Sequence, residues 1–470
     1  MNIRRFALKW LKAFTEIMMA QLSDLTFDKM MARIADMKPE DVFYPRYEFK
    51  SEEEVKSALI ALNKAGVKTV GFSNKEPLNS ATASESEDYF VSVHQMNFAF
   101  GEKQAKWVAD NLNLIPDVET LDFSGCKVGD ENAALLLKAL QNTNVTDLHL
   151  ENTYLTSQIG SAFKDTLPRT KLKKLSIGNN YSMKDDAYAQ LVAVLPETKI
   201  ETLNLSKGNV ADKSAAAFEK VLPESSLTSL NINSAGFSKD GMTAFVNGLK
   251  KSKLTDLNMS QMRHTEQTAA ILTDALPELH VKKLRYDIWH TYSDEFYDKA
   301  AKSIRDPRCR LEQPFFGVSY ASPQNAQKIN SACEFLKSNV AYRLAIAQKT
   351  KANAGKEPPE EMGLVDALEN GFIEQALNRR PPLSSAVCMT EEKDGVSLLS
   401  AAIRAERLDT LFSSKNWNNA KEFAAAWDHV PPEHRWQLDG KDGRPSFPKI
   451  KNEVMKKAVL SAVRKNNVRN

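Results

Sequence analysis

Cysteine is scarce in this sequence of 470 residues, and its four copies lie far apart. There is no Cys-x-x-Cys pair and no repeated cysteine spacing, which argues against a secreted disulfide framework and against a cysteine-based zinc site. The seven histidines show no metal-ligand spacing either. We therefore expect a protein of a reducing compartment, the cytoplasm, that holds no metal and no other cofactor. The cysteines are Cys126, Cys309, Cys333 and Cys388.

Net charge is nearly absent as well, because 63 basic residues are balanced by 60 acidic ones, for a formal charge of +3. So small an excess gives no net positive charge that would attract nucleic acid or an anionic membrane. Long apolar runs are also missing, since none approaches the roughly 18 residues that cross a bilayer. Lys9 and Lys12 interrupt the apolar stretch near the start, which predicts an amphipathic helix rather than a signal peptide. We expect neither a nucleic-acid partner nor a membrane span.

Motifs that carry chemistry are missing too. The sequence has no Gly-rich phosphate loop of either common type, no His-Glu-x-x-His and no Gly-x-Ser-x-Gly. None of the four cysteines begins the Cys-x-Asp motif of certain bacterial ubiquitin ligases. We therefore expect no catalytic residue and no enzyme activity. An enzyme with an unrecognised catalytic domain near the C-terminus is kept as an alternative.

The sequence does contain an internal repeat between residues 118 and 286. Three apolar residues recur as apolar-x-x-apolar-x-apolar, and successive copies begin 27, 27, 28, 27, 27 and 27 residues apart. The last two apolar residues of each copy alternate at period two, which places both on one face of a short strand. Seven copies in this register predict a solenoid of stacked units. The copies are Val118/Leu121/Phe123, Val145/Leu148/Leu150, Leu172/Leu175/Ile177, Ile200/Leu203/Leu205, Leu227/Leu230/Ile232, Leu254/Leu257/Met259 and Val281/Leu284/Tyr286.

Between the strands, apolar residues recur at helical spacing and each segment ends on a leucine, such as Leu140 or Leu167. A strand and a helix in each repeat resembles the ribonuclease-inhibitor-like subclass of leucine-rich repeats, over about residues 88 to 290. The resemblance implies an α/β leucine-rich-repeat solenoid with helical N- and C-terminal regions. It further implies a horseshoe with a parallel sheet on its concave face and helices on its convex face. In that family the third residue after the last apolar residue of the strand motif is usually Asn or Cys, as at Cys126 and Asn180 here.

Two weaker copies of the repeat precede the seven. One is predicted at Val67 to Phe72 and the other at Phe90 to Met96, 27 residues before the first regular copy if it starts at Val91. We interpret the first as an irregular capping repeat, because an uncapped apolar end would face water. The solenoid is therefore expected to span residues 66–293.

The residues between the apolar strand positions are expected to face the concave side. Asn204, Asn231 and Asn258 fall at equivalent positions and predict an asparagine ladder, whose amides can donate and accept hydrogen bonds. A solvated sheet face would also be polar, and the large anchors of typical interfaces are missing apart from Arg285. The candidate protein-binding residues are Asp147, His149, Glu151, Lys174, Asn204, Asn231, Asn258, Lys283 and Arg285. The other candidate surface consists of Tyr286, Ile288, Trp289 and Tyr292, which we interpret primarily as the core of a C-terminal cap.

Residues 1–65 predict a helical N-terminal cap. Within it, residues 25 to 42 resemble the front half of an F-box: an opening leucine, an acidic residue three positions on, apolar residues at helical spacing, then Pro-x-Asp-apolar. F-boxes joined to leucine-rich repeats occur in substrate receptors of ubiquitin ligases, so the resemblance implies contact with a ligase adaptor. A cap made of paired helices would show a similar pattern. The residues that would bind the adaptor are Leu25, Met30, Ile34, Pro39 and Val42.

The 27-residue register is lost after Asp306. Residues 294–349 predict a helical C-terminal cap, residues 350–361 a linker rich in Lys, Pro and Glu, and residues 362–470 a helical domain. Two stretches that begin at Leu364 and Gly395 resemble ankyrin-repeat helices, over residues 362–412. Ordinary paired helices would look much the same.

The leading interpretation is a protein-binding scaffold or adaptor that engages its partner through the leucine-rich-repeat surface. The combination with ankyrin-like segments resembles effector proteins of intracellular bacteria, which implies secretion into a host cytoplasm and action on host proteins. The first alternative is an F-box-type substrate receptor of a ubiquitin ligase. A fold does not by itself determine a function, so these readings depend on the side chains of the site.

Overall fold

A computed structural model describes residues 26–430, except for 46, 73–99, 263, 289, 307–308, 361, 380–382, 414–415 and 418–419. The described residues divide into two compact units. The first holds the residues up to Leu272 together with Lys283–Thr291 and Phe315–Tyr320. The second holds Thr273–Lys282, Tyr292–Pro314 and the residues from Ala321 onward. No helix in this described part of the chain is long and apolar enough to cross a membrane.

The first unit is built on a ten-stranded sheet in which each strand lies beside its neighbour in the sequence. From β1 to β9 the pairing is parallel and in register, so that Leu121, Leu148 and Leu175 meet as direct partners. The seven repeats predicted from the sequence are β3 to β9, which confirms the α/β leucine-rich-repeat solenoid. The strands are β1 (Val42–Phe43), β2 (Thr69–Gly71), β3 (Thr120–Asp122), β4 (Asp147–His149), β5 (Lys174–Ser176), β6 (Thr202–Asn204), β7 (Ser229–Asn231), β8 (Asp256–Met259), β9 (Lys283–Asp287) and β10 (Gln313–Gly317).

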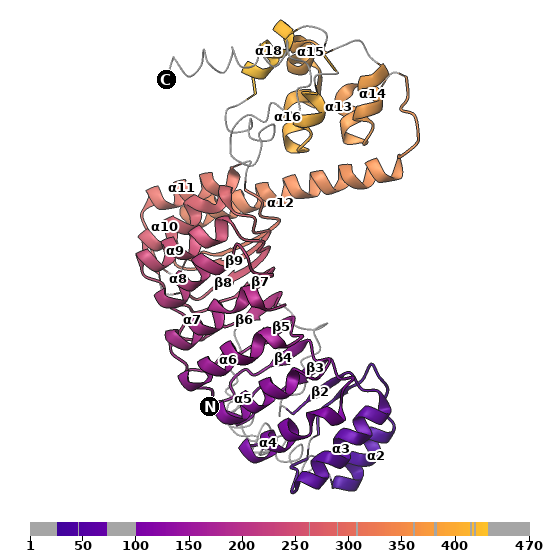
Figure 1. Ribbon diagram of the computed structural model, residues 1–470. Helices are drawn as coiled ribbons and strands as arrows, with labels where there is room; N and C mark the ends of the chain where they lie inside the picture. Colours follow the sequence, from indigo (N-terminus) through magenta and orange to yellow (C-terminus); the bar gives the residue numbers. More distant parts are fainter. Residues whose placement is uncertain are drawn as a thin grey trace, which may run out of the picture. The chain divides into compact units, whose positions relative to one another are not determined.

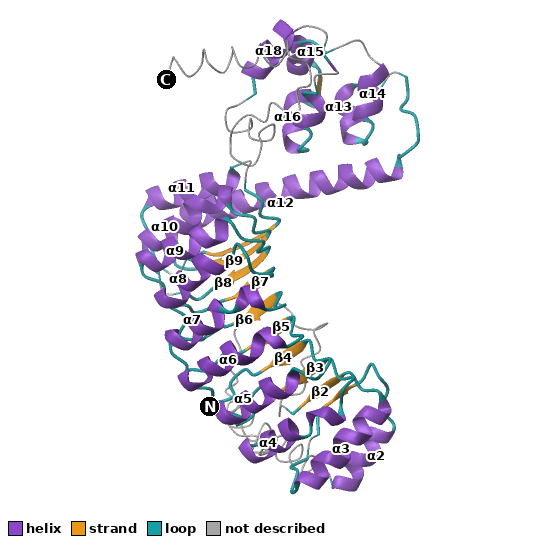
Figure 2. Cartoon of the chain, viewed as in Figure 1, coloured by secondary structure: helices purple, strands orange, loops and turns teal. Residues whose placement is uncertain are grey.

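Helices follow the strands and lie along one side of the sheet (Figure 1, Figure 2). The central leucine of each strand from Leu121 to Leu284 is at most 1% exposed. Several helices end where a Leu-Pro pair starts a 3-10 turn, because proline has no N–H to continue an α-helix. The helices are α2 (Phe27–Ala35), α3 (Glu52–Ala65), α4 (Glu102–Asp110), α5 (Gly129–Leu140), α6 (Gly160–Thr166), α7 (Asp185–Ala193), α8 (Asp212–Val221), α9 (Lys239–Lys250) and α10 (Glu266–Ala275).

Each strand from β3 to β8 leaves the sheet through the same left-handed turn. The second residue after β8 and the third after each of the others has a positive φ, between 53° and 79°. In the first five turns its amide donates to a carbonyl of the next repeat, as from Asn152 to Gly178 at 3.0 Å and from Asn179 to Ser206 at 2.8 Å. In the sixth turn the amide of Gln261 donates instead to Asp287 Oδ2 at 2.9 Å. The turn therefore links each repeat to the one after it. The six left-handed residues are Gly125, Asn152, Asn179, Lys207, Ser234 and Gln261.

Asn180 occupies the loop position that usually holds Asn or Cys in leucine-rich repeats, and its side chain bonds to the backbone of the loop. This residue is 2% exposed, and its Oδ1 accepts the amides of Thr153 at 2.9 Å and Leu155 at 3.2 Å. Its Nδ2 donates to the carbonyls of Leu150 at 2.8 Å and Ile177 at 2.9 Å. One carboxamide thus satisfies backbone groups of two successive repeats, in an interior where unpaired groups are costly.

The N-terminal end of the sheet differs from the prediction. The capping strand predicted from Val67 is present as β2, but β2 pairs directly with β3, and 51 positions separate Thr69 from its partner Thr120. The other weak copy, Phe90 to Met96, lies outside the described residues, and its expected place beside β3 is occupied by β2. One strand earlier, β1 begins at Val42, inside the segment predicted to be helical.

The C-terminal end of the sheet also extends further than predicted. The segment 294–349, expected to be helical, contains β10 between two helices. The amide of Gln313 donates to Lys282 O at 2.9 Å, and the amide of Ile288 donates to Gly317 O at 2.6 Å. This pattern repeats the ladder between earlier strands and pairs residue 285 with residue 315. The repeat therefore continues for one more strand after a spacing of 30 residues.

In the second unit, α11 (Asp294–Arg305) packs on the first half of α12 (Pro323–Ala352). Asn325 Nδ2 on α12 donates to Asp294 Oδ1 on α11 at 2.8 Å. The predicted linker at 350–361 begins inside α12, whose other half contributes Ile346 to the core of the following helices. Those helices are α13 (Leu364–Glu369), α14 (Ile373–Arg379), α15 (Ser385–Thr390), α16 (Leu398–Arg404), α17 (Leu408–Leu411) and α18 (Ala420–Asp428).

In two helix pairs of this unit, α13–α14 and α16–α17, the helices are joined by the same type of turn. The amide of Phe372 donates to Ala367 O at 2.7 Å, and the amide of Arg407 donates to Ala402 O at 2.9 Å, 35 residues later. Both turns contain a left-handed residue, Gly371 in the first and Glu406 in the second. Between the pairs lies a hairpin of β11 (Glu392–Lys393) and β12 (Val396–Ser397).

Candidate protein-binding surface

The first and third residues of each strand face away from the helices, on what we call the open face of the sheet. The strand registers align these side chains into columns that cross the sheet. All nine residues predicted for the concave face lie on this open face or at its edge. The column in its middle, here the central column, consists of Asp122, His149, Ser176, Asn204, Asn231, Asn258, Arg285 and Phe315.

The predicted site residues of the early repeats are bonded to one another. Lys174 Nζ forms an ion pair with Asp147 Oδ2 at 2.7 Å. Glu151 Oε1 accepts from Ser176 Oγ and, at 2.8 Å, from Asn204 Nδ2. Asn204 Nδ2 also donates to Ser176 Oγ at 2.8 Å. These groups satisfy each other, so a partner would have to compete for hydrogen bonds that already exist.

The asparagine ladder is real, but its carboxamide oxygens are used by the chain itself. In Asn204, Asn231 and Asn258 the Oδ1 atom accepts the amide of the second residue onward at 3.0 Å. Asp122 makes the same turn to the amide of Ser124 at 2.8 Å. Asn and Asp favour such turns because their short side chains reach the backbone two residues on. The side-chain amides were expected to donate and accept hydrogen bonds at the surface, and this structural use of the oxygens was not predicted.

The carboxamide nitrogens of Asn231 and Asn258 have no hydrogen-bond partner among the described residues, and both side chains are half-buried. Asn233, in the neighbouring column, is fully engaged: its Nδ2 donates to Ser260 Oγ at 2.7 Å and its Oδ1 accepts from Ser234 Oγ at 2.8 Å. The later half of the central column therefore offers N–H donors to solvent.

Beyond the asparagines, the central column ends in a cation and an aromatic ring. The guanidinium carbon of Arg285 lies 5.8 Å from the ring centre of Phe315, whose side chain is 55% exposed. Lys283 is exposed on the same strand as Arg285. Sequence reasoning missed Phe315 because it missed β10. The detectable clue was the apolar pattern Leu311, Pro314 and Phe316, in which proline takes the place of the strand leucine.

Two further exposed aromatic residues were missed. Tyr154 and Tyr181 occupy the same position of successive repeats, immediately after the loop residue, and are 62% and 63% exposed. Tyr181 Oη donates to Asn179 Oδ1 at 3.1 Å. The clue in the sequence was their spacing of 27 residues. They lie at the edge where the strands leave the open face.

The segment that resembles an F-box does not expose its central residues. Met30 and Ile34, expected to contact a ligase adaptor, are both 0% exposed. Val42 is part of β1 and is exposed, as is Pro39, while Leu25 lies outside the described residues. In this structure Met30 and Ile34 are part of the interior at the N-terminal end of this unit.

The aromatic cluster proposed as a second surface is largely interior. Tyr286 and Ile288 are at most 1% exposed, Tyr292 is buried, and Trp289 lies outside the described residues. The ring of Tyr286 stacks on that of His264 at 4.9 Å. The reading of these residues as core side chains agrees with their burial.

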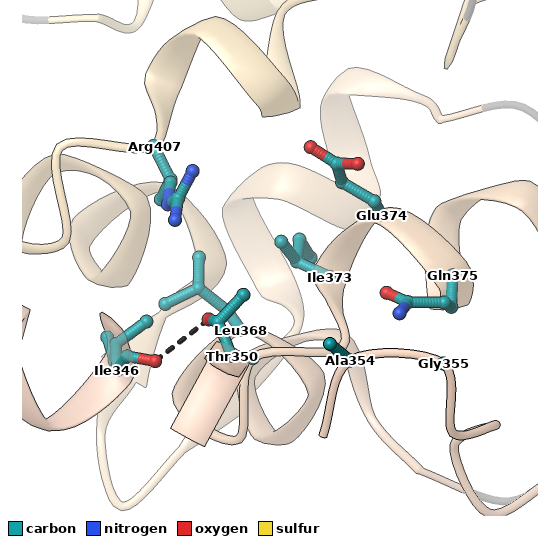
Figure 3. A pocket seen from close by; sticks show the side chains of 10 residues that line it. Ile346, Thr350, Ala354, Gly355, Leu368, Ile373, Glu374, Gln375 and Arg407 are labelled. Atoms are coloured by element: carbon teal, nitrogen blue, oxygen red, sulfur yellow. Dashed lines mark hydrogen bonds between the residues drawn. The ribbon is translucent and has the colours of Figure 1, made fainter. Parts of the chain in front are cut away.

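A cavity of about 290 Å³ lies in the second unit, between the end of α12 and the helix pairs that follow (Figure 3). Ile346, Leu368 and Ile373 form its apolar lining, and Arg407 and Glu374 project from opposite sides. Thr350 Oγ1 is engaged with Ile346 O at 2.8 Å. This cavity was not predicted from the sequence.

The described residues hold no cluster of His, Cys, Asp or Glu that could bind a metal ion. All four cysteines are free and buried. Burial raises the pKa of the thiols of Cys126, Cys309 and Cys388 to about 12 and that of Cys333 to about 11. Thiolates are the reactive form of cysteine, so these four side chains are poor nucleophiles at neutral pH.

Buried His264 makes the stability of the first unit depend on pH. Burial holds its pKa below the ordinary 6.5, and its Nε2 lies 2.7 Å from Asp287 O. The unfolded chain therefore binds a proton more readily, so stability is complete above pH 6.5 and falls as the pH drops toward the folded pKa. We expect the free energy of unfolding of the wild type to decrease between pH 7 and pH 5.5, and to decrease less in His264→Gln, by up to about 1 kcal/mol. Urea unfolding at the two pH values measures this, and equal losses in both proteins would contradict it.

Comparison with known proteins finds likenesses among solved structures. No family of proteins is matched by the sequence, and no curated protein matches it. Similar solved structures include actin-binding site 2 of leiomodin-1, with 14% identity over 41% of this chain and 95% of that one, at a TM-score of 0.27. They also include the yeast complex of Rad7 and Elc1 (15% identity, 51% of this chain, 60% of that one, TM-score 0.31). A third is an internalin of Listeria monocytogenes, with 12% identity over 47% of this chain and 80% of that one, at a TM-score of 0.21. At these TM-scores the likenesses add nothing to the strand order and side-chain contacts described above.

Proposed function

We propose that this chain is a protein-binding scaffold and that the open face of its sheet, centred on the later half of the central column, holds the partner. The observation that carries this proposal is the pair Arg285 and Phe315, an exposed cation beside an exposed ring on adjacent strands. Arginine and aromatic side chains supply most of the binding energy in protein interfaces. The half-buried asparagines beside them provide polar contacts on a rigid sheet.

Rigidity favours this surface over a loop. The strands of the face are fixed by the ladder, and those from β3 to β8 also by the left-handed turn. At β7 and β8 the Asx-type bond adds a further restraint, so few degrees of freedom are lost when a partner binds. An exposed aromatic ring on such a frame leaves apolar surface in contact with water, and a partner that covers the ring buries that surface. The resemblance to bacterial effectors makes a host-cell protein the expected partner.

The test is an affinity pull-down with the full chain and its single variants. We expect Arg285→Ala and Phe315→Ala each to reduce the amount of captured partner about tenfold, as for loss of one central contact. Phe335→Ala is the matched control, because Phe335 lies on α12 in the second unit and is 47% exposed. Equal capture by all four proteins, at unchanged thermal midpoints, would retire the open face as the binding site.

For the second unit we propose two ankyrin-type repeats, α13–α14 and α16–α17. Three features support this: the same turn 35 residues apart, the left-handed residue in each turn, and the hairpin of β11 and β12 between the pairs. Lys393 in the hairpin forms ion pairs with Asp366 at 2.7 Å and Glu369 at 3.0 Å on α13. A repeat pair of this kind would offer a second place for a protein contact.

A further inference from the structure

The central column changes its hydrogen-bonding character between its early and late halves. At Asn204 the carboxamide nitrogen is occupied by Glu151 and Ser176. From Asn231 onward the oxygens are still occupied by the strand-exit turn, while the nitrogens of Asn231 and Asn258 have no partner among the described residues. The next member, Arg285, is exposed and can only donate. Three adjacent strands therefore carry donor groups in this column, while the carboxamide oxygens of Asn231 and Asn258 are engaged by the chain itself.

The spacing of these donors restricts what can meet them. Neighbouring strands lie about 4.8 Å apart, so the three donors span about 9.6 Å. Carbonyls on one side of an extended peptide repeat every two residues, about 6.7 Å. This interval is longer than the spacing of the donors, so only one carbonyl can face a donor at a time. Side chains on one face of an α-helix repeat every three or four residues, about 4.5 to 6 Å, and seven residues rise about 10.5 Å. A helix lying across the strands matches the column over its whole length.

We propose that the partner presents an acidic helix to this column, with carboxylates at positions i, i+3 or i+4, and i+7 facing Asn231, Asn258 and Arg285. This inference rests on the proposed function and names its partner class. Carboxylates are the acceptors best suited to Arg285, since a guanidinium binds them in a bidentate fork. One strand further on, Phe315 would meet an apolar residue about three helical turns from the first carboxylate.

The neighbouring columns are compatible with this occupant. Lys283, exposed on the same strand as Arg285, adds a second cation. Asp287 is turned to the chain itself, because its Oδ2 accepts the amide of Gln261 at 2.9 Å. Asp256 lies half-buried in the column of Lys283, in register with that lysine, and is an opposing charge beside the central column. The helix is therefore expected to lie over the central column rather than over that of Asp256.

The variants Asn231→Asp and Asn258→Asp probe the donors without disturbing the turn. Aspartate keeps the oxygen that accepts the backbone amide and replaces the donor N–H₂ with a charged acceptor. The control is Asn144→Asp, which adds the same charge at an exposed residue away from the column, where Oδ1 accepts from Lys171 Nζ at 2.8 Å. Thermal midpoints of all variants are measured first, so that a loss of folding is recognised.

The experiment is a selection of random 20-residue peptides displayed on phage against the full chain, followed by binding titrations of synthetic copies. We expect enriched peptides with carboxylates at i, i+3 or i+4, and i+7, helical when bound. Their affinity should fall about tenfold or more in the double variant Asn231→Asp/Asn258→Asp and in Arg285→Ala, but not in Asn144→Asp.

The other outcomes separate this inference from the proposed function. Peptides that depend on Arg285 and Phe315 but lack the acidic spacing would overturn the acidic helix and leave the open face as the binding site. Peptides that bind all variants equally would overturn both. A selection that enriches no peptide sensitive to Arg285→Ala would also count against the acidic helix.

Discussion

Asn180→Ala is expected to lower the free energy of unfolding by about 3 kcal/mol. The substitution removes an acceptor from the amides of Thr153 and Leu155 and a donor from the carbonyls of Leu150 and Ile177. The site is 2% exposed, so water cannot replace these bonds without opening the loop. Each buried backbone group left unpaired costs about 1 to 3 kcal/mol, and Thr153 Oγ1 can still serve Leu150 O at 2.7 Å.

Asn209→Ala provides the matched control for this loss. The Nδ2 of Asn209 also bridges to a neighbouring repeat, at 2.8 Å from Tyr181 O and 2.7 Å from Met183 O, but the residue is exposed. Water can hydrogen-bond to both carbonyls in its place, so we expect Asn209→Ala to lower the free energy of unfolding by less than about 1 kcal/mol. Urea unfolding followed by circular dichroism compares the two variants. Similar losses in both would show that the burial of Asn180 is not what makes its bonds important.

Gly248→Ala should destabilise the first unit by about 2 kcal/mol, although alanine is the better helix former by up to about 1 kcal/mol. Gly248 lies on α9 where it meets α8. A Cβ there would stand 2.8 Å from Glu219 Cα and 2.8 Å from Phe218 O. Both are backbone atoms and cannot rotate away, so the two helices must separate, and overpacking of this kind costs about 1 to 3 kcal/mol.

Gly236→Ala is the control for Gly248→Ala. A Cβ at Gly236 would meet no atom within 4 Å, and its φ is not in the left-handed region. We expect its free energy of unfolding to stay equal to that of the wild type or to rise slightly, because alanine restricts the unfolded chain. An increase in stability from Gly248→Ala would mean that α8 and α9 are free to move apart.

The sheet was predictable wherever the repeat is regular. From Leu121 to Leu284 the strand leucines recur at a nearly constant interval, and only a stack of equivalent strands buries all of them. At the two ends the interval changes. Residue 314, which should be a strand leucine, is proline, and 30 residues separate Leu311 from Val281. Edge strands tolerate proline because one side of the strand needs no N–H, which hid β10 from a search for leucines.

The candidate site was predictable in its position and less so in its chemistry. Strand register followed from the repeat, so Asn204, Asn231 and Asn258 fell into one column as expected. Which atom of each carboxamide remains free depends on the turn after the strand, and a list of strand residues does not contain that turn. Met30 and Ile34 show the same limit, because an apolar stripe looks alike on a docking helix and on a packed one.

The pairing of β2 with β3 shows where residues can be inserted into this architecture. Thr69 and Thr120 are register partners on neighbouring strands across 51 positions, whereas Thr120 and Asp147 are register partners across 27. The closure entropy of a loop grows only with the logarithm of its length, by about 0.6 kcal/mol for each doubling. A lineage of such proteins could therefore acquire or lose whole segments between two strands while keeping the ladder intact. Length differences among homologues should accumulate at this crossover before they appear in the strands.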